Sequence, residues 1–503
     1  MNVEDIFLKF ANGGQRDFFS FETFILNLLK YHIENQDKKF ALVESQRGFG
    51  DAYAEDGFDS FKGYTVIDVK YSLHRMPSRM LTDQYIHRFT RLDKQPIFSN
   101  LLIVNFHSVP SRIVSRMLEE ISSINPELKI TIWGPDEITK LANRHKKKAA
   151  EIANNLFSLR LENAVTKEAG DWEKERDEKV ELLKECYERG QFSMFLGAGV
   201  SSSAGMPDWN TLLNSLFVSY LTKEFTQQTN ISDEDIKQIV ERLNTIDEPS
   251  ALMAARYLRK GLSKQTTEIK EFTKTITDNL YKLRDVKKSL NSDLITAISN
   301  LCMPRRTGAK VRTVITYNFD DLIERQLNLK SIQHHSIYND NEAFDPDELP
   351  IYHVHGFLPE DTKKYEGLEK STLVFSEEGY HQIYTDAYHW SNLVQLTSLR
   401  ENNCLMVGLS LTDPNLRRLL DISARNIERQ RHYAFMRRLS IENFAYSQLD
   451  DKRQQLVNNV KGAEEFLNRH HKLNEEIMKE LGVSIIWFTS FEEIPEILKK
   501  INS

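Results

Sequence analysis

Four short segments of the chain combine glycine, asparagine, aspartate, serine and histidine in a way that suits ligand binding and catalysis. They read G-A-G-V-S from Gly197, T-Y-N-F-D-D from Thr316, H-V-H-G from His353 and V-G-L-S-L-T-D-P-N from Val407. Each follows or ends an apolar run, which is typical of a buried parallel strand. Open α/β sheets bind ligands at the carboxyl ends of such strands. The four segments together favour a single nucleotide pocket over four unrelated turns.

The first segment is a glycine turn between an expected strand at 192–196 and an expected helix. Gly197 and Gly199 have no Cβ, so the backbone can turn tightly and approach a ligand closely there. A strand that leads through such a turn brings backbone N–H groups against phosphate. By itself G-A-G is a weak signal, because the dinucleotide fingerprint G-x-G-x-x-G is incomplete.

The other segments supply candidates for chemistry, each with a structural alternative. Asn318 could cap a helix, His355 could be a satisfied core histidine, and Gly408 could serve a turn alone. His353 and His355 are two residues apart and so share a strand face. No third ligand follows nearby, and a catalytic or structural histidine is therefore favoured over a metal site.

A second constellation lies near the N-terminus, where carboxylates and a lysine alternate along a predicted hairpin. We expect strands at 58–61 and 64–71 joined by a glycine turn. Asp68 and Lys70 then share one face, and Asp59 lies opposite them. Two carboxylates can hold Mg²⁺, and a lysine can orient water for attack on phosphorus. The trio predicts a nuclease site, and the alternative is a hairpin with exposed salt bridges.

This arrangement resembles the PD-(D/E)xK restriction-endonuclease family, and specifically its Mrr-like domains. In that family a helix bearing a glutamate precedes G-x-D, and a strand with (D/E)-x-K follows. By resemblance these places are taken by Glu22, Asp59, Asp68 and Lys70. Asp59 and Asp68 would hold the Mg²⁺, and Asp56 is a rival for Asp59. Such domains either cut nucleic acid or sense it, and the residues do not separate the two.

A basic stretch follows the trio, and its functional interpretation is contact with the phosphates of a duplex. The alternative is a solvated helix face. Its members are Arg75, Arg79, His87, Arg88, Arg91 and Lys94. Buried strands at 101–106 and 129–133 and a closing helix at 135–144 are expected to complete this first domain.

Length and composition limit what these sites can belong to. A chain of 503 residues exceeds what one hydrophobic core covers, so two or three domains are expected. The net charge of -7 gives no global attraction to DNA or acidic membranes. No apolar run approaches the roughly 20 residues that span a bilayer, and the N-terminus lacks a signal-peptide pattern. We therefore predict a cytoplasmic protein without a membrane segment.

The three cysteines are far apart and odd in number, which indicates a reducing compartment and excludes a four-cysteine zinc module. The expected fold class is α/β in three parts. A restriction-endonuclease-like α/β domain covers 1–165, and a charged connecting helix covers 166–190. A Rossmann-like parallel-sheet domain covers 191–503, with a helical insertion at about 209–300. Further strands are expected at 372–379, 432–436 and 483–488.

The second domain resembles the sirtuin family over roughly residues 191–503. G-A-G-V-S-S-S-A-G-M-P-D-W matches the first sirtuin signature, T-Y-N-F-D-D its T-x-N-x-D segment, and H-V-H-G its H-G motif. V-G-L-S-L-T-D-P-N-L matches the late G-x-S strand. The most similar branch is that of bacterial antiphage effectors, such as those of Thoeris-type and HerA-associated systems, which look like NAD⁺ hydrolases. Deacylase sirtuins carry a four-cysteine zinc module that this chain lacks, so zinc is not expected.

The resemblance implies that NAD⁺ binds across the strand ends. Asn318 would orient the ribose or the attacking water, and His355 would act as general base, which its ordinary pKa of about 6.5 permits near neutrality. The diphosphate would be cradled by backbone N–H groups and a hydroxyl of Ala198, Gly199 and Ser201, and Asp208 would lie near the nicotinamide. Gly408 and Ser410 would line the adenosine side. Asp320 or Asp321 would fix the loop and the helix that follows it. This binding set comprises Ala198, Gly199, Ser201, Asp208, Asp320, Gly408 and Ser410.

The main functional hypothesis is an NAD⁺ glycohydrolase that releases nicotinamide and ADP-ribose as a triggered effector of antiphage defence. The alternative is a Mg²⁺-dependent DNA nuclease that NAD(H) or ADP-ribose gates through the sirtuin-like domain. A third is a binding module with both sites inert, and protein deacylation comes last. Expected partners are DNA or another phage-derived trigger, a HerA-like ATPase or another defence subunit, and further copies of the chain. The insertion at 209–300 is expected to cover the pocket.

Overall fold

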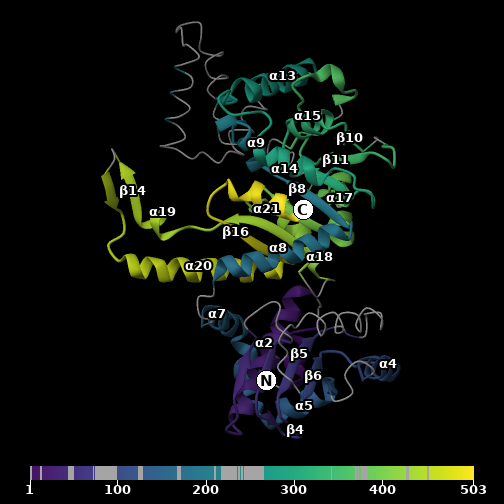
Figure 1. The fold of residues 1–503 in the computed structure, drawn as a ribbon, viewed down its shortest axis with the longest axis vertical. Helices are drawn as coiled ribbons and strands as arrows, with labels where there is room; N and C mark the ends of the chain where they lie inside the picture. The colour runs from purple at the N-terminus through teal and green to yellow at the C-terminus, as the bar shows by residue number, and fades with distance from the viewer. Residues whose placement is uncertain are drawn as a thin grey trace. The chain divides into compact units, whose positions relative to one another are not determined.

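The structure is a computed structural model, and it describes most of the chain (Figure 1). The described residues are 3–11, 14–43, 50–71, 99–122, 128–166, 171–208, 211–213, 215–216, 266–340, 343–368, 388–425, 430–449 and 452–503, with isolated positions between them. The basic stretch at 75–94 lies outside these residues, as do most of the expected insertion before 266 and most of the expected strand at 372–379.

The chain divides into two compact units, each with its own sheet. Unit 1 comprises Met1–Glu178, Ala424–Gln430 and Ser440–Gly482, and unit 2 comprises Lys179–Ser423, Arg431–Leu439 and Val483–Ser503. Residues 440–482 therefore group with unit 1, although the sequence analysis includes them in the second domain. The expected connecting helix is α8 (Trp172–Glu188). The domain boundaries at 165 and 190 stay a prediction.

Unit 1 contains a five-stranded mixed sheet in the order β1-β2-β5-β6-β7. Its strands are β1 (Phe40–Leu42), β2 (Ala52–Ala54), β5 (Thr65–Lys70), β6 (Asn100–Asn105) and β7 (Lys129–Trp133). β1, β2 and β5 pair antiparallel, and β5, β6 and β7 pair parallel. The strands expected at 101–106 and 129–133 are thus confirmed.

Helices complete unit 1, and the longest in its N-terminal segment has an apolar face of helical period. α2 (Gln15–Glu34) buries Phe21, Phe24 and Leu28, three or four residues apart, in the same core as β5. The other helices are α1 (Val3–Leu8), α4 (Ser111–Ser122), α5 (Pro135–Arg144), α6 (Lys146–Asn154), α7 (Leu156–Thr166), α19 (Ile441–Ala445) and α20 (Val460–Glu480). A two-stranded sheet of β14 (Tyr446–Leu449) and β15 (Lys452–Gln455) lies between the last two.

The hairpin expected from 58–61 and 64–71 is wrong. β3 (Gly57–Phe58) instead pairs with β4 (Phe61–Lys62), and β5 pairs with β2 and β6. The reason is a tight turn at Asp59, whose φ of 45° is left-handed, so the chain folds back within 57–62. β5 then finds its antiparallel partner in β2, upstream of that turn.

Unit 2 contains a seven-stranded sheet whose order is β10-β11-β9-β8-β12-β13-β16 and whose neighbouring strands all pair parallel. Its strands are β8 (Phe192–Leu196), β9 (Val311–Thr316), β10 (His334–Ile337), β11 (Leu349–His353), β12 (Asn403–Val407), β13 (His432–Arg437) and β16 (Val483–Phe488). Every residue of β8 and β16 is buried, as expected where helices cover both faces of a parallel sheet. The expected α/β class with a Rossmann-like parallel sheet is confirmed.

The helices of unit 2 follow the strands in the manner of a doubly wound fold. They are α9 (Ala198–Ser203), α13 (Thr266–Lys282), α14 (Asp293–Leu301), α15 (Leu322–Leu329), α17 (Trp390–Glu401), α18 (Pro414–Ala424) and α21 (Glu493–Asn502), with a 3-10 helix η2 at Thr362–Lys364. The chain passes from β8 to β9 on one side, and from β11 to β12 on the other side of β8. The strand order therefore reverses between β8 and β12. Among the described residues no helix is long and apolar enough to cross a membrane.

Candidate functional site

The four sequence segments begin at one edge of the parallel sheet. The strand register places His353 beside Thr316, Thr316 beside Leu196, and Leu196 beside Val407. These are the last residues of four adjacent strands, β11, β9, β8 and β12. The turns that carry H-V-H-G, T-Y-N-F-D-D, G-A-G-V-S and V-G-L-S therefore leave the sheet side by side. This edge contains the strand-order reversal, where doubly wound folds bind their ligands.

Glycines let the turns after β8 and β12 cross in direct contact. The Gly197 N–H donates to the Val407 carbonyl at 2.9 Å, and the Gly199 N–H donates to the Gly408 carbonyl at 3.0 Å. A Cβ on Gly197 would lie 2.5 Å from the Gly408 oxygen, and one on Gly408 would lie 2.7 Å from the Val200 nitrogen. Gly408 also has a φ of +69°, which favours glycine. Side chains at these positions would force the two turns apart.

Asn318 is held against the glycine turn by both its backbone and its side chain. Its Nδ2 donates to the Gly197 carbonyl at 3.0 Å, and its backbone N–H donates to Thr316 Oγ1 at 3.1 Å. Because a carbonyl only accepts hydrogen bonds, the amide must present its nitrogen to Gly197. The Asn318 Oδ1 has no hydrogen-bond partner among the residues that the structure describes, and it is not a fully buried atom. A ligand can therefore reach this oxygen.

His355 lies at the end of β11 against an aromatic ring. Its imidazole packs edge-on to Tyr317, with ring centroids 4.8 Å apart and planes at 84°. Burial lowers the pKa of the His355 imidazole, while the negative charge of Asp413 opposes that shift. Asp413 follows the glycine turn of β12 and caps α18, where its Oδ1 accepts from the Leu416 N–H at 2.7 Å. His355 is consequently a free base near neutrality, as a proton acceptor must be.

His353 has a different environment, in the core beneath the site. Its Nε2 lies 2.6 Å from Glu324 Oε1, and its Nδ1 lies 3.2 Å from the Asn318 carbonyl oxygen. Glu324 is on α15, the helix after the T-Y-N-F-D-D segment, and its Oε1 also accepts from Ser336 Oγ at 3.1 Å. The two histidines are only two residues apart in sequence, but their side chains lie in different environments and do not form one site. Within the described residues no group of three or more histidine, cysteine, aspartate or glutamate side chains is arranged to hold a metal.

Ser201 and Asp320 contact each other, which narrows the role expected for the serine. Burial raises the pKa of Asp320 to about 6, against hydrogen bonds from the Ser201 hydroxyl and the Leu322 N–H. The Gly199 N–H is likewise already engaged by Gly408. The backbone N–H of Ala198, by contrast, donates no hydrogen bond to the described residues. It is therefore the N–H group of this glycine turn that can donate to an anion.

Two other residues of the expected binding set are exposed and make local contacts. Asp208 Oδ1 accepts from the Thr211 N–H at 2.8 Å, in the manner of a helix cap. The Ser410 hydroxyl lies 2.6 Å from Thr412 Oγ1. Leu411, between Ser410 and Thr412 in the sequence, is buried and has a φ of 57°, a left-handed conformation that is strained for leucine. The binding roles of Asp208 and Ser410 stay predictions.

α13, a helix of the expected insertion, is attached to the loops of the site. The hydroxyl of Tyr281, on α13, lies 3.1 Å from Asp321 Oδ1 and 3.0 Å from the Leu358 carbonyl oxygen, and its single proton is shared between these two acceptors. Arg325 pairs with the same Asp321 carboxylate at 2.7 Å. Burial and the charge of Asp321 raise the pKa of the Tyr281 hydroxyl, which stays protonated as a donor. Asp321 therefore fixes its loop.

The cluster in unit 1 contains Asp51 where the sequence analysis expects Asp59. Asp68 is paired with Lys70 on β5, and Asp51 Oδ2 accepts from the intervening Val69 N–H at 2.6 Å. Burial, followed by the negative charge of Asp51, raises the pKa of Glu22 to about 8, and the positive charges of Lys479 and then Lys70 oppose this. The signal that was missed is the position of Asp51 directly before β2, the antiparallel partner of β5.

Asp59 lies elsewhere in unit 1, so its expected place beside Asp68 and Lys70 is corrected. Its Oδ2 is 2.8 Å from His32 Nε2, and its Oδ1 accepts from Gln36 Nε2 at 3.1 Å. The cause is the tight β3–β4 turn, which directs this residue toward α2. His32 Nδ1 in turn lies 2.9 Å from His145 Nε2.

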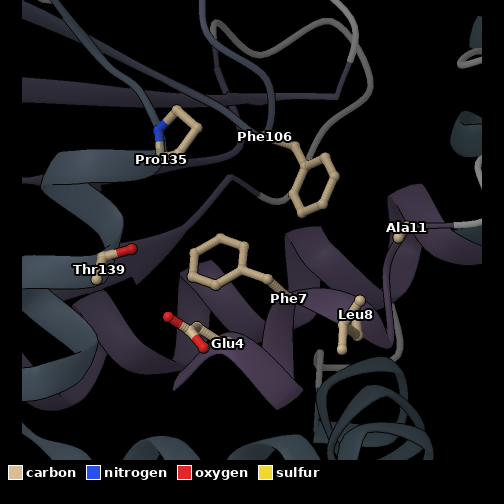
Figure 2. Close-up of a pocket in the computed structure, with 7 residues that line it drawn as sticks. All are labelled: Glu4, Phe7, Leu8, Ala11, Phe106, Pro135 and Thr139. Carbon is tan, nitrogen blue, oxygen red and sulfur yellow. The ribbon is translucent and has the colours of Figure 1, made fainter. Parts of the chain in front are cut away.

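Unit 1 also has an open, mostly apolar cavity of about 490 Å³ between α1 and α5. Figure 2 shows the Phe7 and Phe106 rings side by side in its wall, with centroids 5.9 Å apart. Its lining residues are Glu4, Phe7, Leu8, Ala11, Phe106, Pro135 and Thr139. The lining offers one carboxylate and one hydroxyl, and it contains none of the expected site residues.

Comparisons with known proteins match a range that contains the T-Y-N-F-D-D, H-V-H-G and V-G-L-S segments. Residues 312–459 match the family described as SIR2-like domain, a range that includes Asn318, His355 and Gly408. Over 330 residues the chain is 25% identical to a protein from Enterococcus faecium named NAD(+) hydrolase ThsA. The similarity covers 64% of this chain and 57% of that protein, so the chain matches somewhat over half the length of the relative.

Proposed function

We propose that the sheet edge of unit 2 binds NAD⁺ and hydrolyses it to nicotinamide and ADP-ribose. The observation that carries the proposal is the row of four adjacent strand ends, which brings together the glycine crossing, Asn318 and His355. The match to a SIR2-like domain and the similarity to a protein named as an NAD⁺ hydrolase support the same activity.

The chemistry needs little acid assistance, because the leaving group departs as neutral nicotinamide. Cleavage of the nicotinamide–ribose bond leaves a cationic, oxocarbenium-like sugar, and water adds to it with loss of one proton. His355, neutral through burial, accepts that proton as general base. The Asn318 Oδ1 accepts a hydrogen bond from a ribose hydroxyl or the attacking water, while its Nδ2 stays on Gly197.

The glycine crossing holds the phosphate end of the ligand. Gly197, Gly199 and Gly408 pack against each other at the strand-order reversal, and Ala198 between the first two is exposed, so its N–H is available to a phosphate oxygen. Ser201 contributes indirectly by holding Asp320. We assign Ser410 to the adenosine side and Asp208 to the nicotinamide side, as the sirtuin resemblance implies.

We further propose that this activity serves bacterial antiphage defence, where NAD⁺ depletion follows a trigger. The sirtuin resemblance of the four motifs supports this role. DNA or another phage-derived signal, a HerA-like ATPase or another defence subunit, and further copies of the chain are the partners we propose. α13 belongs to the insertion expected to cover the pocket, and its contact with Asp321 supports that expectation.

The test is NAD⁺ consumption by the purified full chain, with and without DNA or phage-infected lysate. Asn318→Ala and His355→Ala should each lower turnover by about 10²–10⁴-fold, the range of a general base. Asn328→Ala on α15 and His335→Ala on β10 are matched controls away from the strand row and should keep full turnover. Full turnover in either site variant would refute the assignment. Absence of turnover under all conditions would refute the activity.

A second candidate function is Mg²⁺-dependent cleavage of nucleic acid by unit 1. The observation that favours it is the cluster of Glu22, Asp51, Asp68 and Lys70, which joins carboxylates and a lysine. Asp68→Ala or Lys70→Ala should abolish DNA degradation and leave NAD⁺ turnover intact. Asp59→Asn, at the distant β3–β4 turn, is the matched control and should cut normally. Undiminished cutting in Lys70→Ala would contradict this function.

A further inference from the structure

The most deeply buried ion pair of the described residues lies next to the proposed catalytic asparagine. The side chains of His353 and Glu324 are 0% and 1% exposed, and their facing atoms are 2.6 Å apart. His353 comes from the end of β11, and Glu324 from the first turn of α15. Neither residue belongs to the proposed catalytic set, so a charged pair in the core needs its own explanation.

Stability alone does not explain the pair. Burying two charges costs several kcal/mol per ion, and their attraction repays that cost only when the remaining polar atoms are satisfied. Glu324 Oε2 is buried and has no hydrogen-bond partner among the described residues. An apolar pair of similar volume would be neutral or stabilising at such a place. Net stability therefore does not account for this pair.

The hydrogen-bond pattern defines the protonation of the pair. The Asn318 carbonyl can only accept, so His353 Nδ1 must carry a proton. Nε2 faces a carboxylate oxygen that also accepts from Ser336, so a second proton lies between His353 and Glu324. Burial would raise the pKa of Glu324, but the charge and hydrogen bond of His353 lower it overall. The Nδ1–H thus points at Asn318, and Nε2 is held by the Glu324 carboxyl group.

Other groups face this pair and are compatible with that state. His334 on β10 lies near Glu324 and contributes to lowering the pKa of its carboxyl, and the charge of Glu324 contributes to raising the pKa of Asp320. Tyr365 has its pKa raised by burial and by Glu324, so its hydroxyl stays neutral. The Phe357 ring lies 4.0 Å from the His353 ring, centroid to centroid, where an aromatic face favours a cation.

We propose that the His353–Glu324 pair is a positioning device for Asn318. His353 Nδ1–H donates to the Asn318 carbonyl from β11, while the Asn318 Nδ2 donates to the Gly197 carbonyl just after β8. The backbone and the side chain of Asn318 are thus each held by one hydrogen bond. The side chain cannot rotate without breaking one of the two bonds, so Oδ1 keeps a single direction. This inference rests on the proposed NAD⁺ hydrolysis, because it assigns two further residues to that site.

The informative variants separate position from charge. In Glu324→Gln the amide can donate to Nε2 of a neutral His353, whose Nδ1–H still holds the Asn318 carbonyl, so kcat should stay within about threefold of wild type. In the double variant His353→Phe/Glu324→Met no donor reaches that carbonyl, yet the core remains apolar and filled. Its kcat should fall about 10–100-fold, as when a residue that orients a ligand is lost, with KM within about threefold.

A matched pair of the same chemistry is available as control. His335 Nδ1 lies 3.5 Å from Glu348 Oε2 at the amino ends of β10 and β11, the ends away from the proposed site. Both side chains are over 30% exposed. The variant His335→Phe/Glu348→Met should leave kcat and KM unchanged. Urea unfolding of every variant reports folding separately from turnover.

The outcomes are distinct from those that test the activity itself. If wild type consumes NAD⁺ and Asn318→Ala does not, but the folded His353→Phe/Glu324→Met variant keeps full kcat, the positioning role is overturned and the activity stands. A loss of kcat in Glu324→Gln equal to that of the double variant would also overturn it, since charge would then matter instead of position. If Asn318→Ala keeps full turnover, the proposed function itself fails.

Discussion

Replacing Gly408 by alanine tests whether the crossing of two turns holds the site together. Two costs add at this position. An L-residue with a φ near +69° costs about 1–2 kcal/mol. The new Cβ would also lie 2.7 Å from the Val200 nitrogen, and overpacking of this kind costs about 1–3 kcal/mol. We expect Gly408→Ala to lower the free energy of unfolding by about 2–5 kcal/mol.

Two other glycines separate these costs. Gly367 has a φ of +74° with nothing within 4 Å of an added Cβ, so Gly367→Ala measures the backbone strain alone. Gly197 has a φ of -117°, which any residue adopts, but its Cβ would lie 2.5 Å from the Gly408 oxygen. Gly197→Ala therefore measures the contact alone. The expected order of destabilisation is Gly408→Ala first, Gly197→Ala second and Gly367→Ala last.

The assay is urea unfolding of the three variants, with NAD⁺ turnover measured on the same preparations under native conditions. Pushing the turns apart moves the Gly197 carbonyl, which holds Asn318, so Gly408→Ala and Gly197→Ala should also lose turnover. Gly367→Ala should keep it. A Gly408→Ala variant no less stable than Gly367→Ala, with full turnover, would refute the close approach as the organising contact.

Two further predictions concern buried polar groups of unit 2. Burial lowers the pKa of His432 from 6.5 to about 3, so below about pH 6.5 the unfolded chain binds a proton that the folded chain does not. Stability is therefore full above pH 6.5 and falls by about 1.4 kcal/mol per pH unit below it, and His432→Leu should flatten urea midpoints between pH 6.5 and 4.5. Tyr281→Phe leaves the Leu358 carbonyl without its donor, while Asp321 keeps Arg325, and should cost about 1–3 kcal/mol, whereas Tyr388→Phe, on a residue that is 81% exposed, should cost less than about 0.5. Equal urea midpoints for the two tyrosine variants would contradict the second prediction.

The strands of unit 2 could be predicted because they are continuous apolar runs that end in polar turns. β8, β13 and β16 lie within one residue of where the sequence places them. Their order could not be predicted, since pairing depends on where each crossover helix packs. Nothing in the residues of V-G-L-S indicates that Gly408 touches Gly199.

Within the candidate sites, the spacing of residues along the sequence indicated which residues are functional candidates, but it did not indicate which side chains they contact. Asp68 and Lys70 were predictable from their spacing on one strand. Asp59 and Asp51 both follow a glycine closely, and antiparallel pairing of β2 with β5 alone decides between them. His353 and His355 look alike in sequence, yet one lies in the core on Glu324 and the other packs on Tyr317.

The assignment of residues 440–482 to unit 1 has a consequence for biosynthesis. Its neighbours in sequence, β13 and β16, are adjacent strands of the unit 2 sheet. The ribosome therefore delivers Met1–Glu178 long before α20, which completes the unit to which they belong. The apolar core of the N-terminal segment is built from its own residues, whereas the buried carboxyl of Glu22 also faces the charges of Lys479 and Glu476 on α20. These electrostatic contacts of unit 1 therefore form only after about 480 residues have been made, long after its apolar core has been synthesised.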